Sequence, residues 1–577
     1  MRVMLLLATI GMACAPRDTD PVNHATQPLK TTTITVHAGA RQTFVAYGTS
    51  YGTGGYGAIT DPAVRAQAAD MLWKELGLKI LRLWYGPCSQ AFDYAAAKSL
   101  FYSRYVKNGE IADAVSRNAE LLLAPACGEG TIANIPQLAK NIAQLVADLK
   151  KEKGLDVATT GLANEPGGMS PAAVVQGVKL LRQELDARGL AGVRIIAPEW
   201  ASADGAALQR IDALKGDAQA WQALHGVATH SYNMAATEEV AKRVIGTGKT
   251  YWQTESSDNG DEGPDNAVRA ATTAARVLND LNHMVTHWIW FIGWGTGGYY
   301  DGDGGTKLFV YDPSSGKLLK HLKYSYLLQL RQTLRPGALV RHCTSAGEGE
   351  MHYTYGLKPA INAAAAQNAD GSWALGVVND TGIPSSWSGT SWHPAETFEV
   401  TLDVAELAGA GDAPFKVMRS KKGKPLEDEG TLTMKGGKVK VTVAPLELVT
   451  LLGPSTSPPT AEDGGAAEGL PGDGKTPGDE GPADDGWAAS EGASGTDRGA
   501  AAGDNGTAGD DDGQRAGLRG GSGCSAAGGE PPAAYLLLCL CFGLLALGRA
   551  SREEAQQGRP SARNRPSDRT SSWRRPS

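Results

Sequence analysis

The sequence predicts a (β/α)8 barrel joined to a β-sandwich, and three observations support this prediction. Between residues 42 and 326, short apolar or β-branched runs alternate with amphipathic stretches. Eight such runs fit into this part of the chain, and the barrel needs eight strands. From about residue 338 the helical periodicity ends, and short alternating runs separated by turn residues replace it.

The predicted barrel strands are rich in aliphatic or aromatic residues and lie at 43–47, 80–84, 121–124, 157–162, 193–197, 226–230, 250–254 and 285–291. Amphipathic helices are clearest at 170–188 and 264–281. Ser170 is the predicted N-cap of the first helix, with Pro171 at the first helical position and Gly189 just after its end. A doubly wound open sheet is the alternative on periodicity alone. However, the Gly-rich residues 52–57 lack the spacing of a dinucleotide-binding fingerprint, so we interpret them as a loop at the barrel mouth.

The predicted sandwich is assembled from both flanks of the barrel. A Thr-rich run at 31–36 is a candidate strand that could pair with the later ones, so we assign residues 30–41 plus 338–453 to the sandwich and 42–337 to the barrel. The other candidate strands are 373–379, 397–402, 415–419, 430–434, 438–443 and 447–452.

Both ends of the chain read as export and surface signals. Residues 1–14 fit a secretory signal peptide; cleavage before a lipidated Cys14 and ordinary cleavage nearby remain open, since Gly11 departs from the lipoprotein pattern. Residues 454–532 are an acidic Gly/Ala/Pro linker, which we expect to be disordered. The apolar segment and basic tail at 533–577 predict either a processed surface-sorting signal or a short transmembrane anchor. Every alternative places the protein outside the cell or at its surface.

Charge and cysteine usage exclude some classes of function. The net charge of −7 argues against nucleic acid as a partner. The seven cysteines form no Cys-x-x-Cys motif or Cys/His cluster, so we expect no metal site. We also expect no cofactor and a monomeric protein. Cys88 and Cys127 would lie just past neighbouring strands, where they form either a disulfide or two unpaired loop thiols.

A glutamate follows the predicted fourth strand in the tripeptide Asn164-Glu165-Pro166. Catalytic residues of this barrel lie at the C-terminal ends of its strands. A Glu held there can protonate a departing glycosidic oxygen if its pKa is raised, and Asn164 can hydrogen-bond the 2-hydroxyl of a sugar. Taken alone, the tripeptide also fits an ordinary turn before proline.

A second glutamate, Glu255, closes the predicted seventh strand. Retaining glycosidases use two carboxyl groups about 5–5.5 Å apart, one as acid/base and one as nucleophile. The fourth and seventh strands end on the same rim, so both side chains can reach one sugar. The pair therefore predicts a retaining glycosidase.

These two motifs resemble those of the glycoside hydrolases of clan A, and within the clan the chain most resembles family 30. Residues 42–50 are similar to the first-strand Gly-Phe-Gly motif of that family, with Ala46 and Tyr47 as departures. Residues 323–326 and 334–337 look like its final helix and Arg-Pro-Gly junction. The resemblance covers about residues 32–453 and includes a sandwich built from both flanks; the glucuronidase and xylosidase families of the clan remain alternatives.

Residue by residue, the resemblance implies Glu165 as acid/base and Glu255 as nucleophile. His230 and Tyr232 match the His-x-Tyr of the clan, so Tyr232 would hydrogen-bond the nucleophile and His230 would position the acid/base. A strand-capping His and a half-buried Tyr are the alternatives. Arg82 in the second strand matches a clan arginine that steadies the charge of the nucleophile.

Aromatic side chains at the rim could form the platform on which a sugar ring stacks. We predict this role for Trp290 and Trp294, with Trp84 as a further candidate. Trp288 shares a face with Trp290 by strand alternation, and a place in the barrel core is the alternative for both. The acidic residues after the nucleophile are interpreted as solvated: Asp258, Asp261 and Glu262.

The sequence thus predicts a secreted or surface-held retaining β-glycosidase that hydrolyses a β-linked oligo- or polysaccharide. A non-catalytic glycan-binding or adhesion protein on the same scaffold is an alternative that the loss of either Glu would favour, and both are present. A transglycosylase would use the same residues and remains open, as does the identity of the glycan.

Overall fold

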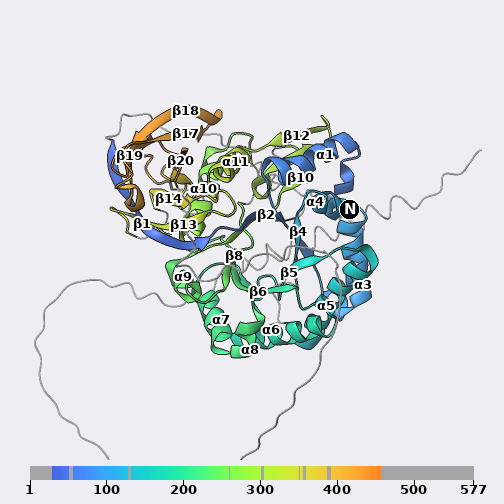
Figure 1. Cartoon of the computed structure of the whole chain (residues 1–577). Helices are drawn as coiled ribbons and strands as arrows, with labels where there is room; N and C mark the ends of the chain where they lie inside the picture. Colours follow the sequence, from blue (N-terminus) through green and yellow to red (C-terminus); the bar gives the residue numbers. More distant parts are fainter. Residues whose placement is uncertain are drawn as a thin grey trace, which may run out of the picture. The chain divides into compact units, whose positions relative to one another are not determined.

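Figure 1 shows a computed structural model of the chain, which describes residues 29–50, 56–127, 132–258, 260, 262–299, 304–349, 351–354, 359–385 and 391–456. The predicted signal peptide at 1–14, the tail at 533–577 and all but residues 454–456 of the predicted linker lie outside these ranges, as do Gly-rich residues 52–55. Among the helices of the described ranges, none combines the length and apolar character needed to cross a membrane.

Eight strands close into a barrel, which confirms the predicted fold class. Each strand pairs in parallel with the next along the chain, and the last pairs with the first through Ala46 and His287. The strands are β2 (Ala46–Ser50), β3 (Ile80–Tyr85), β4 (Glu120–Pro125), β5 (Val157–Gly161), β6 (Arg194–Trp200), β7 (Gly226–Thr229), β8 (Thr250–Gln253) and β9 (His287–Trp290).

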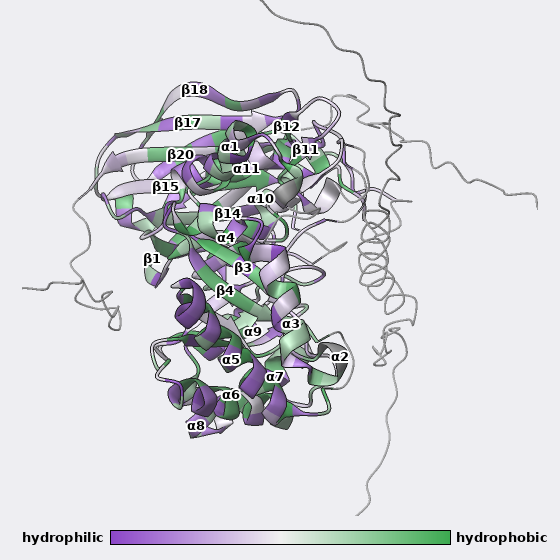
Figure 2. Ribbon diagram, turned by 90° about the vertical axis from the view of Figure 1, so that its right-hand side faces the viewer, coloured by the Kyte–Doolittle hydropathy of each residue, from purple (hydrophilic) through white to green (hydrophobic). Residues whose placement is uncertain are grey.

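Helices surround the barrel and turn their apolar faces toward its strands. Figure 2 shows hydrophobic residues along β3 and β4 and hydrophilic residues on the helices outside them. The Ser170 hydroxyl caps the sixth helix by accepting from Ala173 N at 3.2 Å, as predicted. The helices are α1 (Pro62–Asp70), α2 (Ser89–Phe92), α3 (Tyr94–Phe101), α4 (Glu110–Val115), α5 (Ile135–Lys153), α6 (Pro171–Asp186), α7 (Gly205–Gly216), α8 (Ala218–Ala223), α9 (Glu238–Val244), α10 (Ala267–Asn282) and α11 (Leu322–Thr333), with short turns η1 (Tyr56–Ala58), η2 (Met71–Glu75), η3 (Tyr102–Val106), η4 (Gly304–Thr306) and η5 (Ala405–Leu407).

A small apolar cluster fills the inside of the barrel and fixes which residues point inward. The largest member is Trp252, whose ring stacks on His287 with 3.6 Å between centroids. Because strand residues alternate, the residue two positions after a cluster member also points into the barrel, and it lies nearer the C-terminal rim. The cluster takes one residue from each of seven strands: Ala46, Ile80, Leu122, Ile196, Ala228, Trp252 and Ile289.

Nine strands form the second sheet, whose apolar core includes Val36, Leu375 and Phe415. The N-terminal strand β1 lies between β13, with which it is antiparallel, and β16, with which it is parallel. This confirms that the strand before the barrel pairs with the sandwich. The strands are β1 (Lys30–Thr43), β13 (Leu339–Ser345), β14 (Ile361–Gln367), β15 (Ser372–Asn379), β16 (Phe398–Val404), β17 (Ala413–Lys421), β18 (Lys424–Met434), β19 (Lys438–Val443) and β20 (Leu448–Ser455).

Five strands have no counterpart in the sequence prediction: β13, β14 and a three-stranded sheet after the barrel. Strand β14 is buried along its whole length and is mostly alanine, so it shows no alternation of polar and apolar residues. Its Ala363 packs in the core of the sandwich, whereas Ala364 packs in the barrel layer. The small sheet consists of β10 (Trp294–Thr296), β11 (Phe309–Asp312) and β12 (Lys317–Lys320).

The sandwich contacts the barrel through α10, α11 and a loop. The helices pack against β14, β15 and β20. In addition, Met234 forms a β-bridge with Thr354, and Ala235 N donates to Tyr353 O at 3.1 Å. A loop of the sandwich therefore holds the segment that follows β7 of the barrel.

Candidate active site

The structure brings together the two predicted glutamates. Glu165 lies four residues after β5 and Glu255 two residues after β8, both at the C-terminal rim. One carboxylate oxygen from each, together with a ring nitrogen of His230, lie within 4.8 Å of one another. This proximity suits two carboxyl groups that act on one sugar with retention.

The same three groups are also near enough to hold a metal ion, but each has another partner. His230 Nδ1 bonds Glu165 Oε1 at 2.8 Å. The guanidinium of Arg82 contacts Glu255, so a cation already occupies the place beside that carboxylate. The donors are therefore arranged to serve each other, which suits acid/base chemistry better than metal binding.

Two donors contact the side-chain oxygens of Glu255. Arg82 Nη1 donates to Oε2 at 2.5 Å, and the Tyr232 hydroxyl donates to Oε1 at 2.6 Å. Only 4% of Glu255 is exposed, so these bonds act in a poorly solvated place where charge-assisted hydrogen bonds are strong. An ionised carboxylate fixed at both oxygens can serve as a nucleophile.

Arg82 points into the barrel because it lies two residues after Ile80 on the same face of β3. Its Nη2 also donates to Asn164 Oδ1 at 2.5 Å. Burial alone would lower the pKa of Arg82, but Glu255 and Glu199 raise it overall. The predicted residues Arg82, Asn164 and Glu255 thus form one connected network.

Glu165 has the environment of a proton donor. Burial raises its pKa to about 7, and the opposing effect of Arg82 is smaller. Its partner His230 is fully buried, and burial lowers the pKa of that imidazole to about 4, so His230 is neutral at neutral pH. Two carboxyl groups in one site with such different surroundings match a division between acid and nucleophile.

Glu199 is a buried carboxylate of this network that the sequence prediction missed. It lies near the end of β6, is 0% exposed, and its Oε1 is 3.3 Å from Arg82 Nη2. The sequence around it, Ala197-Pro198-Glu199-Trp200, contains no motif that would mark the residue. Its contact with Arg82 joins β6 to β3 across the barrel, and strand patterns do not show such contacts.

The prediction for Trp290 and Trp294 as a sugar platform is wrong, because both side chains are buried (0% and 1% exposed). Trp290 Nε1 donates to the main-chain oxygen of Thr306 at 2.9 Å. For Trp290 the reason is strand alternation: Ile289 faces the barrel interior, so Trp288 and Trp290 face the outer layer. Trp294 lies in β10 of the small sheet and packs edge-on against Tyr56.

The aromatic residue that faces the mouth is Phe291, one position after Trp290. Its ring stacks on Trp84 with 5.4 Å between centroids, and both side chains are partly exposed. Phe291 N donates to Ser256 O at 3.0 Å, which places it beside the nucleophile. Trp84, which was predicted, and Phe291, which was not, are therefore the candidates for a sugar-stacking surface.

Two of the acidic residues read as solvated are instead ion-paired. Glu262 is 1% exposed and bonds Lys323 Nζ at 2.5 Å. Asp258 bonds Arg276 Nη1 at 3.1 Å. The partners lie 61 and 18 residues later, on α11 and α10, so the polarity of the loop itself did not reveal them. Asp261 lies outside the described residues.

Cys88 and Cys127 form a disulfide, which decides between the two alternatives left open by the sequence. Cys88 follows β3, which carries Arg82, and Cys127 follows β4. The next strand along the chain, β5, precedes Glu165. Cys343, the free cysteine of the described residues, is buried in the sandwich.

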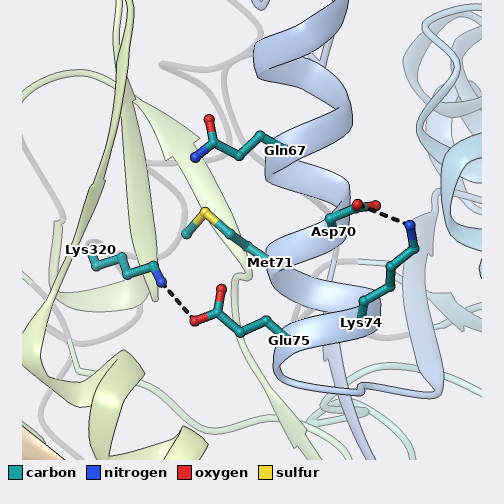
Figure 3. A pocket seen from close by; sticks show the side chains of 6 residues that line it. All are labelled: Gln67, Asp70, Met71, Lys74, Glu75 and Lys320. Carbon is teal, nitrogen blue, oxygen red and sulfur yellow. Dashed lines mark hydrogen bonds and ion pairs between the residues drawn. The ribbon is translucent and has the colours of Figure 1, made fainter.

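A pocket elsewhere on the barrel has no catalytic constellation (Figure 3). Its charged residues pair among themselves, Lys74 with Asp70 at 2.9 Å and Lys320 with Glu75 at 2.8 Å. It lies between η2 and β12, and none of the predicted site residues lines it.

Solved structures with this architecture carry glycoside hydrolase names. The catalytic domain of GH30 xylanase C from Talaromyces cellulolyticus has 17% identity and a TM-score of 0.51, with 73% of this chain and 100% of that chain covered. The family 30 subfamily 8 xylanase Xyn30A from Clostridium acetobutylicum has 15% identity and a TM-score of 0.52, with 74% and 100% covered. The fold is similar to that of family 30 glycoside hydrolases.

The endo-β-1,6-glucanase BT3312 also has a similar structure, with 16% identity, a TM-score of 0.51, and 73% of this chain and 93% of that chain covered. By sequence alone, no protein-family model matches the chain, and no curated protein matches it. The resemblance expected from the motifs is therefore confirmed at the level of the fold.

Proposed function

We propose that this protein is a retaining β-glycosidase that hydrolyses O-glycosidic bonds by double displacement. The observation that carries the proposal is the pair Glu165 and Glu255, whose oxygens lie within 4.8 Å in unlike surroundings. Glu255 accepts bonds from a cation and a hydroxyl, whereas burial raises the pKa of Glu165 to about 7.

In the first step, a carboxylate oxygen of Glu255 attacks the anomeric carbon of the sugar. The bond from that carbon to the leaving oxygen breaks, and Glu165 gives its proton to this oxygen. In the second step, Glu165 as a carboxylate takes a proton from water, which attacks the same carbon and releases Glu255. Asn164 would hydrogen-bond the 2-hydroxyl of the sugar, and Trp84 with Phe291 would stack on its ring.

We infer that the substrate is a β-linked oligo- or polysaccharide. The similar structures are named as xylanases and as an endo-β-1,6-glucanase, so xylan and β-1,6-glucan are the first substrates to try. We further propose export to the cell surface, based on the sequence of residues 1–14 and 533–577.

The test is hydrolysis of a panel of β-linked polysaccharides and aryl β-glycosides by the full chain. Glu255→Ala should abolish turnover of every substrate. Glu165→Ala should lose most activity on substrates with poor leaving groups, and azide should restore turnover of activated ones. Glu184→Ala is the control, since Glu184 is a helix-surface residue paired with Arg188.

Three results would contradict the assignment. Hydrolysis by Glu255→Ala would remove the nucleophile from the mechanism. Glycan binding without turnover of any substrate by the wild type would favour the alternative of a non-catalytic glycan-binding protein. A product of increased length in place of hydrolysis would favour transglycosylation.

A further inference from the structure

Two buried carboxylates share one buried arginine at the bottom of the candidate site. Arg82 donates to Glu255 Oε2 at 2.5 Å and lies 3.3 Å from Glu199 Oε1. Arg82 and Glu199 are both 0% exposed, and the Glu255 side chain is 5% exposed. The proposed mechanism uses Glu255 and Arg82 but assigns no task to Glu199.

Glu199 is fixed in place by its surroundings. Its main chain adopts a positive φ of 53°, which is uncommon for a residue with a side chain. Its main-chain oxygen accepts from Glu165 N at 3.1 Å. Its carboxylate fills the space beside Gly161, where an added Cβ would lie 1.7 Å from Oε2. Burial raises the pKa of Glu199 and the neighbouring Arg82 opposes this effect, so the charge of Glu199 depends on its ion pair with Arg82.

The first step of a double displacement changes the charge beside Arg82. A Glu255 oxygen forms a bond to the anomeric carbon, and its carboxylate becomes a neutral ester. Arg82 keeps its charge and is buried, and a buried charge that has lost its partner is strongly unfavourable. Glu165 is a carboxylate at this stage but bonds His230, whereas Glu199 is the remaining carboxylate in an ion pair with Arg82.

We propose that Glu199 is a positioning residue that supplies the counter-charge of Arg82 while Glu255 is esterified, an inference that rests on the proposed double displacement. Glu199 forms and breaks no bond. Its charge lowers the free energy of the ester form, in which Arg82 keeps its bond to Asn164 Oδ1 but no longer faces a charged Glu255.

A double-mutant cycle on stability tests this without any substrate. Glu255→Gln replaces the carboxylate by a neutral group of similar shape, as esterification does. Thermal unfolding is measured for the wild type, Glu199→Gln, Glu255→Gln and the double variant. Either single variant leaves Arg82 with one carboxylate, whereas the double variant leaves it with none. We expect the midpoint of the double variant to fall about 3 °C or more below the additive value.

The matched control is the same cycle with Glu262→Gln in place of Glu255→Gln. Glu262 is also a buried carboxylate in an ion pair, but its partner is Lys323 and not Arg82, so its variant should combine additively with Glu199→Gln. Additive behaviour of Glu199 with Glu255 as well would overturn the proposal.

A kinetic arm covers the case in which the double variant does not fold. An activated 2-deoxy-2-fluoro β-glycoside of the preferred sugar traps the glycosyl-enzyme, which intact mass follows. Glu199→Gln should form this ester at least about 10-fold more slowly and hydrolyse it faster, because only the ester form leaves Arg82 unpaired. A general loosening of the site would slow both steps together, and that result would also overturn the proposal.

The two arms separate this inference from the proposed function. If the wild type is neither trapped nor active on any β-glycoside, double displacement is refuted, and the proposed task of Glu199 is refuted with it. If the wild type is active and trapped, but Glu199→Gln is additive with Glu255→Gln or slows both kinetic steps together, only the inference about Glu199 fails.

Discussion

Removing one hydroxyl group from Tyr232 should move the acid side of the pH–activity profile. The Tyr232 hydroxyl donates to Glu255 Oε1 at 2.6 Å. Burial, together with Glu255, raises the pKa of Tyr232 well above its usual value, so the hydroxyl keeps its proton over the working range. A hydrogen bond to a charged carboxylate is stronger than one to a neutral carboxylic acid, so this donor favours the ionised form of Glu255. In the Tyr232→Phe variant, Glu255 should therefore bind a proton more readily.

The size of the shift follows from the kind of bond that is lost. A hydrogen bond to a charged group contributes about 1.5–3 kcal/mol, and one pKa unit corresponds to about 1.4 kcal/mol. The acid limb of kcat/KM, which reports the free enzyme, should move up by about 1–2 pH units. The assay is kcat/KM for an aryl β-glycoside between about pH 3 and pH 9.

Tyr251→Phe is the matched control for this prediction. Tyr251 is also buried, but its hydroxyl pairs with Thr229 at 2.7 Å and does not contact Glu255. Its loss should lower stability and leave the acid limb in place. If Tyr232→Phe reduced kcat/KM equally at every pH, the hydroxyl would not control the ionisation of the nucleophile, and the reasoning would be refuted.

Three further predictions concern proton transfer and stability. Since an acid must carry its proton and burial raises the pKa of Glu165 to about 7, kcat/KM should fall above about pH 7; a profile still flat at pH 9 would contradict this. Replacing Cys88 and Cys127 together by Ser should cost about 2–4 kcal/mol in denaturant unfolding, and an unchanged midpoint would argue against the disulfide. The side chain of Asp280 is fully buried and accepts four hydrogen bonds. Asp280→Asn would place an NH2 group against some of these donors, so it should lower the free energy of unfolding by about 2–4 kcal/mol, as measured by thermal unfolding. Asp312 is only partly buried, so Asp312→Asn should cost much less, and equal losses would be inconsistent with this account.

The fold was predictable because its signals are local. Each barrel strand is a short apolar run that ends at a rim residue, and a run such as 80–84 in the sequence becomes Ile80–Tyr85 in the structure. The pair Glu165 and Glu255 was accessible for the same reason, since strand ends of a barrel converge on one rim. The strands and the glutamates at their ends could therefore be predicted from the order of residues along the chain.

Contacts across the fold could not be predicted in this way. Glu199 reaches Arg82 from three strands away, and Glu262 reaches Lys323, which lies 61 residues later. The error at Trp290 had a different origin, because the strand was correct and only the face was unknown. One buried neighbour, Ile289 inside the barrel, fixes that face and leaves Phe291 at the mouth.

The contact between the sandwich and the segment after β7 limits how this protein can be engineered. Tyr353 O accepts from Ala235 N, and Tyr353 N donates to Asn279 on α10, so a loop of the sheet holds the chain just beyond Tyr232. A catalyst shortened to the barrel would lose this brace together with the sheet. Exchange of the sandwich for another module would need a substitute loop at the same place, or the hydroxyl that orients the nucleophile would be left on an unsupported turn.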